Sequence, residues 1–153
     1  VMRLITNITF IVLFTTSLLA DIIKPKSDIK PEDVVSIQLT SLMKNDQPYK
    51  NAGIEQTWEF AHPSNRAFTG PIQKFTRMMY APSYSVMLNH LKHEILEVRK
   101  EENTAFFFIE LTSKNGKMYG FKWTLSKVNA EGIFKDCWMT TAVSTPMPLS
   151  TSS

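Results

Sequence analysis

Hydrophobic positions along the chain change their spacing once, near Lys92. Up to that point apolar residues recur every three or four positions, which is the spacing of amphipathic helices. Beyond it they alternate with polar residues, which is the spacing of half-buried β-strands. The pattern therefore predicts an α+β fold, with N-terminal helices packed on one face of an antiparallel sheet.

Three helices are expected in the first half of the chain. Prolines mark the starts of the first and the third, at Pro31 and Pro71, and the second begins near Gly53. Their buried stripes are expected at Val35, Leu39, Leu42 and Met43, at Ile54, Trp58 and Ala61, and at Ile72, Phe75 and Met79. Between the second and third helices, Pro63 ends one element and Ser64 starts a short turn. That segment, residues 60–71, is the most distinctive in the sequence.

Four strands are expected in the second half, at residues 92–100, 104–112, 117–128 and 134–143. The connections between them are short, so the sheet is predicted to be a four-stranded antiparallel meander. Helices packed on such a sheet can enclose a cone-shaped pocket between the two layers.

The register of the central hairpin decides which side chains share a face of the sheet. A two-residue turn at Asn115 and Gly116 would set Phe121 opposite Glu110 and bring charge into the core. A three-residue loop, with Gly116 in the left-handed conformation, instead pairs Ile109 with Phe121 and keeps apolar side chains together. We expect this bulged register.

The same alternation assigns the last strand to the two faces of the sheet. Toward the helices it places Cys137, Met139, Thr141 and Val143. The outer face then carries Phe106, Phe108 and Trp138, beside the bare backbone of Gly120. These three aromatic residues are candidate interface residues, covered by a second copy in a homodimer or by the N-terminal segment. The alternative is that exposed aromatics are common on protein surfaces and need no cover.

The ends of the chain are expected to lie outside the domain, which spans residues 31–144. Arg3, an apolar run to Leu19 and then Ala20 form the pattern of a secretory signal peptide over residues 1–20. Threonines dilute the run, and it is shorter than the about 20 apolar residues of a transmembrane helix. Export to the periplasm or the cell exterior, with cleavage near Ala20, is therefore predicted. The alternative is an uncleaved membrane anchor, because Leu18 stands where a small residue is usual.

Two short segments flank the predicted domain. Residues 21–30 are polar and contain proline, which is typical of a tether. Residues 145–153 are rich in serine, threonine and proline, and a disordered tail is expected there.

The composition is that of an ordinary globular protein. The 153 residues are 43% hydrophobic and 20% charged, which fits one domain. The 17 basic and 14 acidic residues are scattered, so the chain lacks the basic patch of a nucleic-acid-binding protein. Cys137 is the single cysteine, which excludes an internal disulfide and a CxxC metal or redox motif.

Candidates for acid–base catalysis fail on their positions. Glu110 falls on the outer face in the bulged register, Glu94 and Glu97 belong to an edge strand, and Asp136 stands at a strand start. His90 and His93 have the spacing of a metal pair, but no further ligand accompanies them. No catalytic set, metal site or cofactor is therefore expected.

Residues 60–71 supply the remaining polar candidates. His62 could act as a base, but a turn residue bonded to backbone is the favoured interpretation. Arg66 could clamp Glu55 or Glu59, or bind an anionic ligand through two hydrogen bonds, and we favour the clamp. Asn65, Arg66 and Trp123 are the weak candidates for a ligand site, where the segment meets the core face of the sheet.

Several of these residues carry a resemblance to a known family. They are the run Phe60-Ala61-His62-Pro63-Ser64-Asn65-Arg66, then Thr69-Gly70-Pro71, Phe75, Met78 and Tyr84, and Cys137-Trp138-Met139-Thr140. Over residues 32–144 the chain resembles family forty-eight sixty-four among the domains of unknown function, which occurs in bacteria and plants. The resemblance implies a cystatin-like or nuclear-transport-factor-like α+β cone. It implies no catalytic or binding residues, and His62 departs from the serine expected before the proline.

Two functions remain after these exclusions. The favoured one is an exported, non-catalytic module that binds a small molecule or a protein. The alternative is an enzyme of the cone-pocket type, similar to an isomerase or a hydrolase, that uses His62 or Arg66 in its pocket.

Overall fold

A computed structural model describes residues 21–150 of the chain. The predicted signal peptide, residues 1–20, and the last three residues of the predicted tail lie outside this range. Helices α1 to α4 span Pro31–Met43, Ala52–Glu59, Pro63–Thr69 and Ile72–Tyr80, followed by a 3-10 turn η1 at Ser85–Met87. Strands β1 to β5 span Lys92–Lys100, Thr104–Thr112, Met118–Lys127, Trp138–Val143 and Met147–Leu149. The chain is therefore an α+β protein with its helices N-terminal to its sheet.

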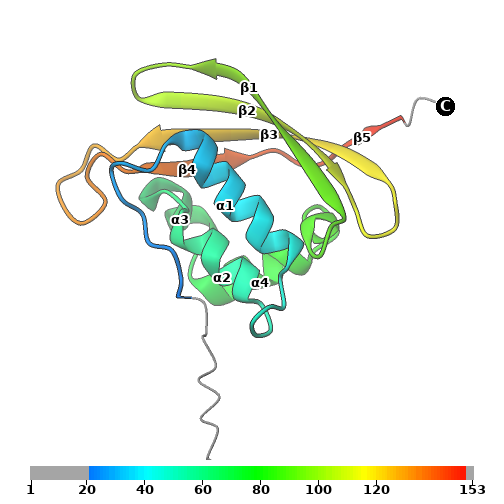
Figure 1. Ribbon diagram of the computed structural model, residues 1–153. Helices are drawn as coiled ribbons and strands as arrows, with labels where there is room; N and C mark the ends of the chain where they lie inside the picture. The colour runs from blue at the N-terminus through cyan, green and yellow to red at the C-terminus, as the bar shows by residue number, and fades with distance from the viewer. Residues whose placement is uncertain (1–20, 151–153) are drawn as a thin grey trace, which may run out of the picture.

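The helices cover one face of the sheet, and the opposite face carries no helix of the described chain (Figure 1). Helix α1 lies nearest the sheet and buries Val34, Val35, Leu39 and Leu42 completely. Facing them across the core are β-strand residues such as Phe107, Ile109 and Phe121. This two-layer arrangement is compatible with the predicted cone.

Helices α1 and α2 cross closely because Gly53 has no side chain. A Cβ atom at this position would overlap the carbonyl oxygen of Ser41 in α1. The backbone N–H of Gly53 donates to the carbonyl oxygen of Asn45 at 2.9 Å, which fixes the turn between the helices. The contact positions α2 beside the pocket described below.

Four α-helices are found in the described residues where three were predicted. The additional one is α3, at the place where the sequence indicated a short turn after Pro63. None of its residues is buried, so it has no apolar stripe that a periodicity argument could detect. Its start is nevertheless a standard one, with Pro63 in the first turn and His62 as the N-cap.

The sheet has the order β1-β2-β3-β4, and β5 also pairs with β3. Ile109 pairs with Phe121 and Phe107 with Trp123, so the bulged register of the central hairpin is confirmed. Gly116 has a φ of +83°, the left-handed conformation that the three-residue loop requires. All the described strand pairs are antiparallel.

The predicted face assignment of β4 is wrong for most of the strand. The pairing with β3 shifts between Thr124 and Leu125, which leaves Thr141 as an extra, unpaired residue. Such a bulge reverses the alternation on its N-terminal side. Thr140 and Trp138 therefore face the helices and Met139 and Cys137 do not, whereas Val143 keeps its predicted side and Thr141 lines the pocket described below. Trp138 is 7% exposed and belongs to the main core, so it is not a residue of the outer face.

The C-terminal segment is more ordered than predicted. Residues Met147–Leu149 form β5, which pairs with Met118–Gly120 of β3 beyond the point where β4 ends. The strand has three residues and contains a proline, so its sequence carries no alternating pattern of useful length. It forms because the β3 edge at Gly120 offers backbone groups that β4 does not reach.

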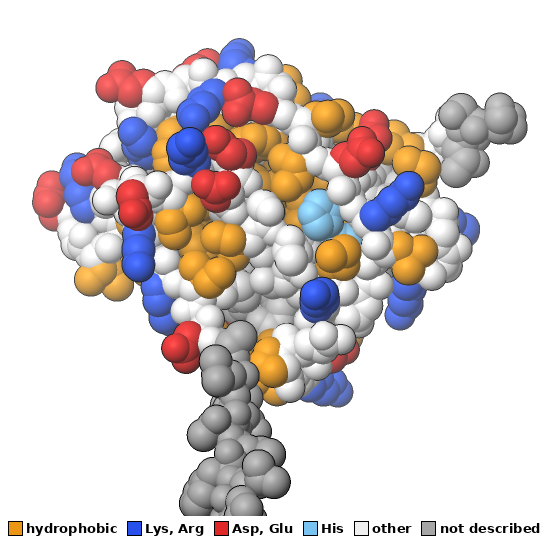
Figure 2. All heavy atoms as spheres, in the orientation of Figure 1, with side chains coloured by type: hydrophobic (Ala, Val, Ile, Leu, Met, Phe, Trp, Pro, Cys, Tyr) orange, Lys and Arg blue, Asp and Glu red, His pale blue; other side chains and the backbone are white. Residues whose placement is uncertain are grey.

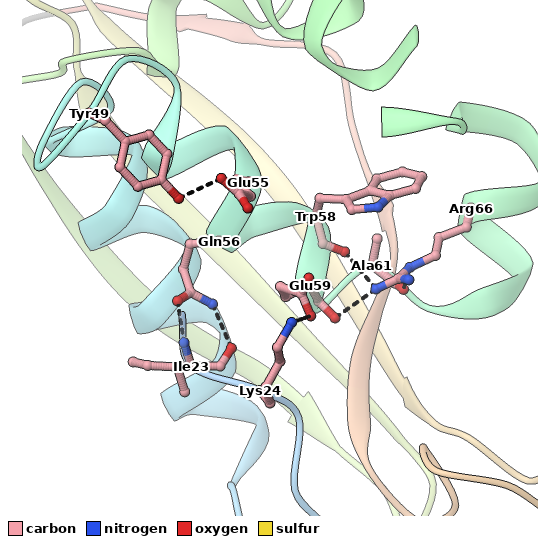
Figure 3. Close-up of polar contacts among 9 residues, drawn as sticks. All are labelled: Ile23, Lys24, Tyr49, Glu55, Gln56, Trp58, Glu59, Ala61 and Arg66. Atoms are coloured by element: carbon pink, nitrogen blue, oxygen red, sulfur yellow. Dashed lines mark hydrogen bonds and ion pairs between the residues drawn. The ribbon is translucent and has the colours of Figure 1, made fainter. Parts of the chain in front are cut away.

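Residues 21–30 do not cover the outer face of the sheet: the segment contacts α2 near its start, and Ile29 packs against the main core. The side-chain amide of Gln56 holds Ile23 by two hydrogen bonds, from Ile23 N–H at 2.7 Å and to Ile23 O at 2.8 Å (Figure 3). Lys24 forms an ion pair with Glu59 at 3.0 Å. We call this docked segment the N-terminal strap.

Charges are mixed on the surface drawn in Figure 2, where acidic and basic side chains alternate with exposed hydrophobic ones. Among the described residues, no helix is both long enough and apolar enough to cross a membrane.

Candidate functional site

A pocket of about 230 Å³ lies between the helices and strands β3 and β4. Its walls are largely apolar and come from α1, α4, η1 and β4: Leu42, Phe75, Met78, Met79, Met87 and Val143. Gln38, Thr57, Trp123 and Thr140 give it a polar base. The pocket occupies the place predicted for the interior of the cone.

The polar base is a closed hydrogen-bond network centred on Gln38, which is 1% exposed. Its Oε1 accepts from Trp123 Nε1 at 3.1 Å and from Thr140 Oγ1 at 2.7 Å. Its Nε2 donates to the carbonyl oxygen of Thr57 at 3.0 Å. One amide therefore joins α1, α2, β3 and β4, and it leaves each of these buried groups with a partner.

Gln38 was missed by the sequence-based reasoning, although a signal was present. It stands four residues before Leu42 and three after Val35, on the apolar stripe of α1. A polar residue at a core position needs buried partners, and these come from strands far along the chain. Nothing in the sequence indicates which strand residues those are.

Asn65 and Tyr84 contribute polar groups farther from the base. Asn65 Nδ2 donates to the carbonyl oxygen of Thr140 at 3.3 Å, and Tyr84 OH donates to that of Val143 at 3.1 Å. Tyr84 is the one ionisable side chain among the described residues lining the pocket. Burial raises the pKa of Tyr84, so its hydroxyl is neutral at physiological pH. The pocket thus presents an uncharged lining.

Arg66 lies outside the pocket and clamps the C-terminal end of α2 (Figure 3). Its Nε donates to the carbonyl oxygen of Ala61 at 2.9 Å, and one terminal nitrogen donates to those of Trp58 and Glu59, each at 2.9 Å. The guanidinium also stacks on the Trp58 ring at 5.0 Å. A cation here satisfies carbonyls that a helix end leaves unpaired.

The clamp that we favoured from the sequence is thus present, but its partners are different. Arg66 binds backbone carbonyl oxygens and not the carboxylates of Glu55 or Glu59, and the Glu59 carboxylate pairs with Lys24 instead. Burial lowers the pKa of Arg66 and the charge of Glu59 opposes that shift. Because these nitrogens donate to backbone carbonyl oxygens and Arg66 does not line the pocket, its guanidinium is poorly placed to bind an anion there.

His62 is a turn residue bonded to backbone, as favoured from the sequence. Its Nδ1 accepts from the backbone N–H of Ser64 at 3.1 Å and caps α3. The backbone N–H of His62 donates to the carbonyl oxygen of Thr140 at 2.8 Å, which ties the start of α3 to β4. Burial lowers the pKa of His62, so the ring is neutral at pH 7 and remains an acceptor. His62 does not line the pocket.

His90 and His93 bind each other rather than forming part of a metal cluster. His90 is 2% exposed, with Nδ1 2.7 Å from the carbonyl oxygen of Met87 and Nε2 2.8 Å from His93 Nδ1. Since Met87 lines the pocket, the histidine pair supports one of its walls. Within residues 21–150, no group of three His, Cys, Asp or Glu side chains is arranged to hold a metal ion.

The sequence-predicted ligand candidates therefore separate into two groups. Asn65 and Trp123 line the pocket, whereas Arg66 and His62 do not. Of the predicted interface residues, Phe106 and Phe108 are half-buried on the outer face, and Trp138 is in the core.

Comparison of the chain with protein-family models, curated proteins and solved structures finds no match. The predicted family membership is consequently supported at the level of an α+β fold alone. The function has to be argued from the pocket and the surface themselves.

Proposed function

We propose that the domain is a non-catalytic module that binds a small, uncharged and mainly apolar ligand between its helices and its sheet. The observation that carries this proposal is the pocket of about 230 Å³ with an apolar wall and an uncharged polar base. A wall of this kind favours burial of apolar surface, and the polar base orients the ligand. A charged ligand would lose its hydration without gaining a counter-charge.

The dimensions limit the ligand to about one aromatic ring with a short substituent. A dry, apolar cavity of about 150 Å³ is known to hold benzene, and the present pocket is somewhat larger. Three methionines in its wall, Met78, Met79 and Met87, have flexible side chains that adapt to ligand shape. Thr140 Oγ1, at the base, retains acceptor capacity for one hydroxyl or N–H group of the ligand.

The cone-pocket enzyme is the weaker interpretation of the same site. It requires a base or a cation directed at the ligand, and the residues proposed for this, His62 and Arg66, are bonded to backbone outside the pocket. Binding without catalysis needs none of these groups. Membership of the uncharacterised family remains a prediction and adds no activity to this proposal.

The proposal can be tested with indole and 2-phenylethanol as probes. Each is expected to raise the melting temperature of the protein and to change the fluorescence of Trp123, whose ring lies on the pocket. Ala61→Leu places a larger side chain in the lining and is expected to abolish both effects. Ala130→Leu, at an exposed position, is the matched control and should behave as the wild type. Equal binding by both variants, or no response of the wild type to either probe, would contradict the proposal.

Export of the protein is a second part of the proposed function. The support is the signal-like pattern of residues 1–20 together with the strap, which holds Ile23 on α2 and leaves Asp21 exposed. Cleavage after Ala20 would therefore keep the hydrogen bonds of Ile23 and the ion pair of Lys24. N-terminal sequencing of protein recovered from the producing cells should read Asp21 first. A sequence that still contains Arg3 would favour the uncleaved anchor instead.

A further inference from the structure

The lining of the pocket has committed most of its side-chain hydrogen-bond donors inside the protein. Its hydroxyl and indole groups belong to Thr57, Thr69, Tyr84, Thr140, Thr141 and Trp123. Each of the five hydroxyls donates its hydrogen to a carbonyl or amide oxygen of the protein, at 2.7 to 3.1 Å. The indole N–H of Trp123 is shared between Gln38 Oε1 and Thr140 Oγ1. These groups have no hydrogen left for a ligand, whereas the hydroxyl oxygens can still accept a bond.

Two amide nitrogens are the other side-chain donors in the described lining. Gln38 Nε2 donates to Thr57 O at 3.0 Å, and Asn65 Nδ2 donates to Thr140 O at 3.3 Å. Each nitrogen has a second hydrogen, so two donors remain against the oxygens of five hydroxyl groups and the Oδ1 of Asn65. The pocket therefore offers a ligand mainly acceptors.

Asn65 carries the acceptor with the most free capacity. Its amide nitrogen, and not its oxygen, faces the carbonyl oxygen of Thr140, because two oxygens cannot form a hydrogen bond with each other. The Oδ1 of Asn65 accepts no hydrogen bond from any other side chain or backbone group of residues 21–150. Both lone pairs of this oxygen are therefore available to a ligand, whereas Thr140 Oγ1 already accepts from Trp123.

Burial of the lining residues places Asn65 at the mouth of the pocket. Gln38, Trp123 and Thr140, at the base, are at most 3% exposed. Asn65 on α3 is half-buried, and Ala142 of β4 is exposed. A ligand that enters from solvent thus places its apolar part toward the base and keeps a polar group at the level of Asn65.

We propose that the pocket selects apolar ligands that carry a hydrogen-bond donor, an N–H or a hydroxyl group, and that Asn65 Oδ1 accepts this bond. The inference rests on the proposed function and names the class of ligand for the same pocket. A ligand whose polar atom is only an acceptor, such as an ether oxygen, meets a lining in which acceptors predominate. It gives up its hydrogen bond to water and finds few donors in exchange.

Indole and benzofuran test the preference, because the two rings differ little except that an N–H donor replaces an oxygen acceptor. Benzofuran is the less polar ring, so burial of apolar surface alone favours benzofuran. We expect indole to bind about fivefold more tightly, measured by isothermal titration calorimetry on the full domain. Benzofuran binding as tightly as indole, or more tightly, would overturn the donor preference and leave the apolar pocket standing. Binding of neither ring would remove the proposed function and this inference together.

Substitution of Asn65 tests its part in the selection. Asn65→Leu and Asn65→Ala both remove the amide oxygen, and since α3 has no buried residue they should leave the fold intact, checked by circular dichroism. In both variants the ratio of the indole and benzofuran affinities is expected to fall to about one or below, because benzofuran does not use Oδ1. Asn129→Leu, at an exposed position outside the pocket, is the matched control and should keep the wild-type ratio. A wild-type ratio in both Asn65 variants would show that Asn65 is not the acceptor.

Discussion

At the scale of single residues, the pocket depends on one side chain that the rest of the core cannot replace. Gln38 is buried among apolar neighbours and bonds Trp123, Thr140 and the backbone of Thr57. A buried amide is tolerated there because both its oxygen and its nitrogen find partners among those groups. Its role is to join the helix layer to the sheet at the floor of the pocket.

Gln38→Leu is expected to destabilise the protein by about 1–3 kcal/mol. The change nearly keeps the size of the side chain but removes the acceptor for Thr140 Oγ1, one of the two acceptors for Trp123 Nε1, and the donor to Thr57 O. Urea unfolding, followed by circular dichroism, gives the free energy of unfolding. Gln73→Leu, at an exposed position of α4, is the matched control and should change it by less than about 0.5 kcal/mol. Equal effects of the two substitutions would show that the network contributes little to stability.

The buried histidine His90 predicts a dependence of stability on pH. Burial is the main cause that lowers the pKa of His90 to about 4. The pKa in the unfolded chain is about 6.5, so folding favours the neutral ring. The contribution of the neutral ring to stability is complete above about pH 6.5 and is lost as the pH falls toward 4.

His90→Gln is expected to lose part of this pH dependence. Between pH 7.5 and pH 4.5 the wild type should lose about 2 kcal/mol more of its free energy of unfolding than the variant does. Urea titrations at the two pH values measure the difference. The carboxylates titrate in both proteins, so their effect cancels in the comparison. A wild-type curve parallel to that of the variant would contradict a depressed pKa for His90.

At the scale of elements, the parts that could be predicted were those with a long, regular pattern. The stripe of α1 and the alternation of β2 and β3 each extend over nine residues or more. The alternation in the two strands was enough to predict the register of the hairpin between them. Helix α3 has no buried residue, and β5 has three residues, so neither carries such a pattern. The bulge at Thr141 changed the faces of Trp138 and Met139, because one inserted residue reverses a period of two.

The candidate site was predictable to a smaller extent, and for a related reason. Asn65 was predicted because it belongs to the distinctive segment 60–71, and Trp123 because it lies on the core face of the sheet that this segment meets. Gln38 and Thr140, in contrast, are 102 residues apart in the sequence. Local sequence carries no information on such a contact. Arg66 does hold the end of α2, but the expected carboxylate partners were wrong, because backbone carbonyl partners cannot be identified from residue types.

The clamp at the end of α2 predicts that lysine cannot replace Arg66. A guanidinium donates to Ala61, Trp58 and Glu59 carbonyls at once and stacks on the Trp58 ring, whereas an ammonium on a flexible stem cannot do both. Arg66→Lys should lower the free energy of unfolding by about 1–3 kcal/mol. Arg77→Lys, at an exposed position of α4, keeps the same chemistry and is expected to be neutral. Similar unfolding curves for the two variants would show that charge alone suffices at position 66.

At the scale of the whole molecule, both ends of the described chain are attached to the body rather than free. The strap is held on α2 by Gln56 and by the pair of Lys24 with Glu59, and β5 completes the edge of β3. The strap has no strand or helix of its own, so around Ile23 its order depends on these few contacts, while Ile29 packs against the main core. Segments held in this way open locally at low free-energy cost.

Loss of the Gln56 amide should therefore release the strap without unfolding the domain. In residues 21–30, Lys26 is the site open to trypsin, since Lys24 and Lys30 are each followed by proline. Gln56→Leu removes both hydrogen bonds to Ile23, and cleavage after Lys26 is expected to accelerate about tenfold while the melting temperature changes little. Gln47→Leu, in the exposed loop before α2, is the matched control. Mass spectrometry of a timed digest gives the rate, and equal rates for the two variants would mean that the strap is held by other contacts.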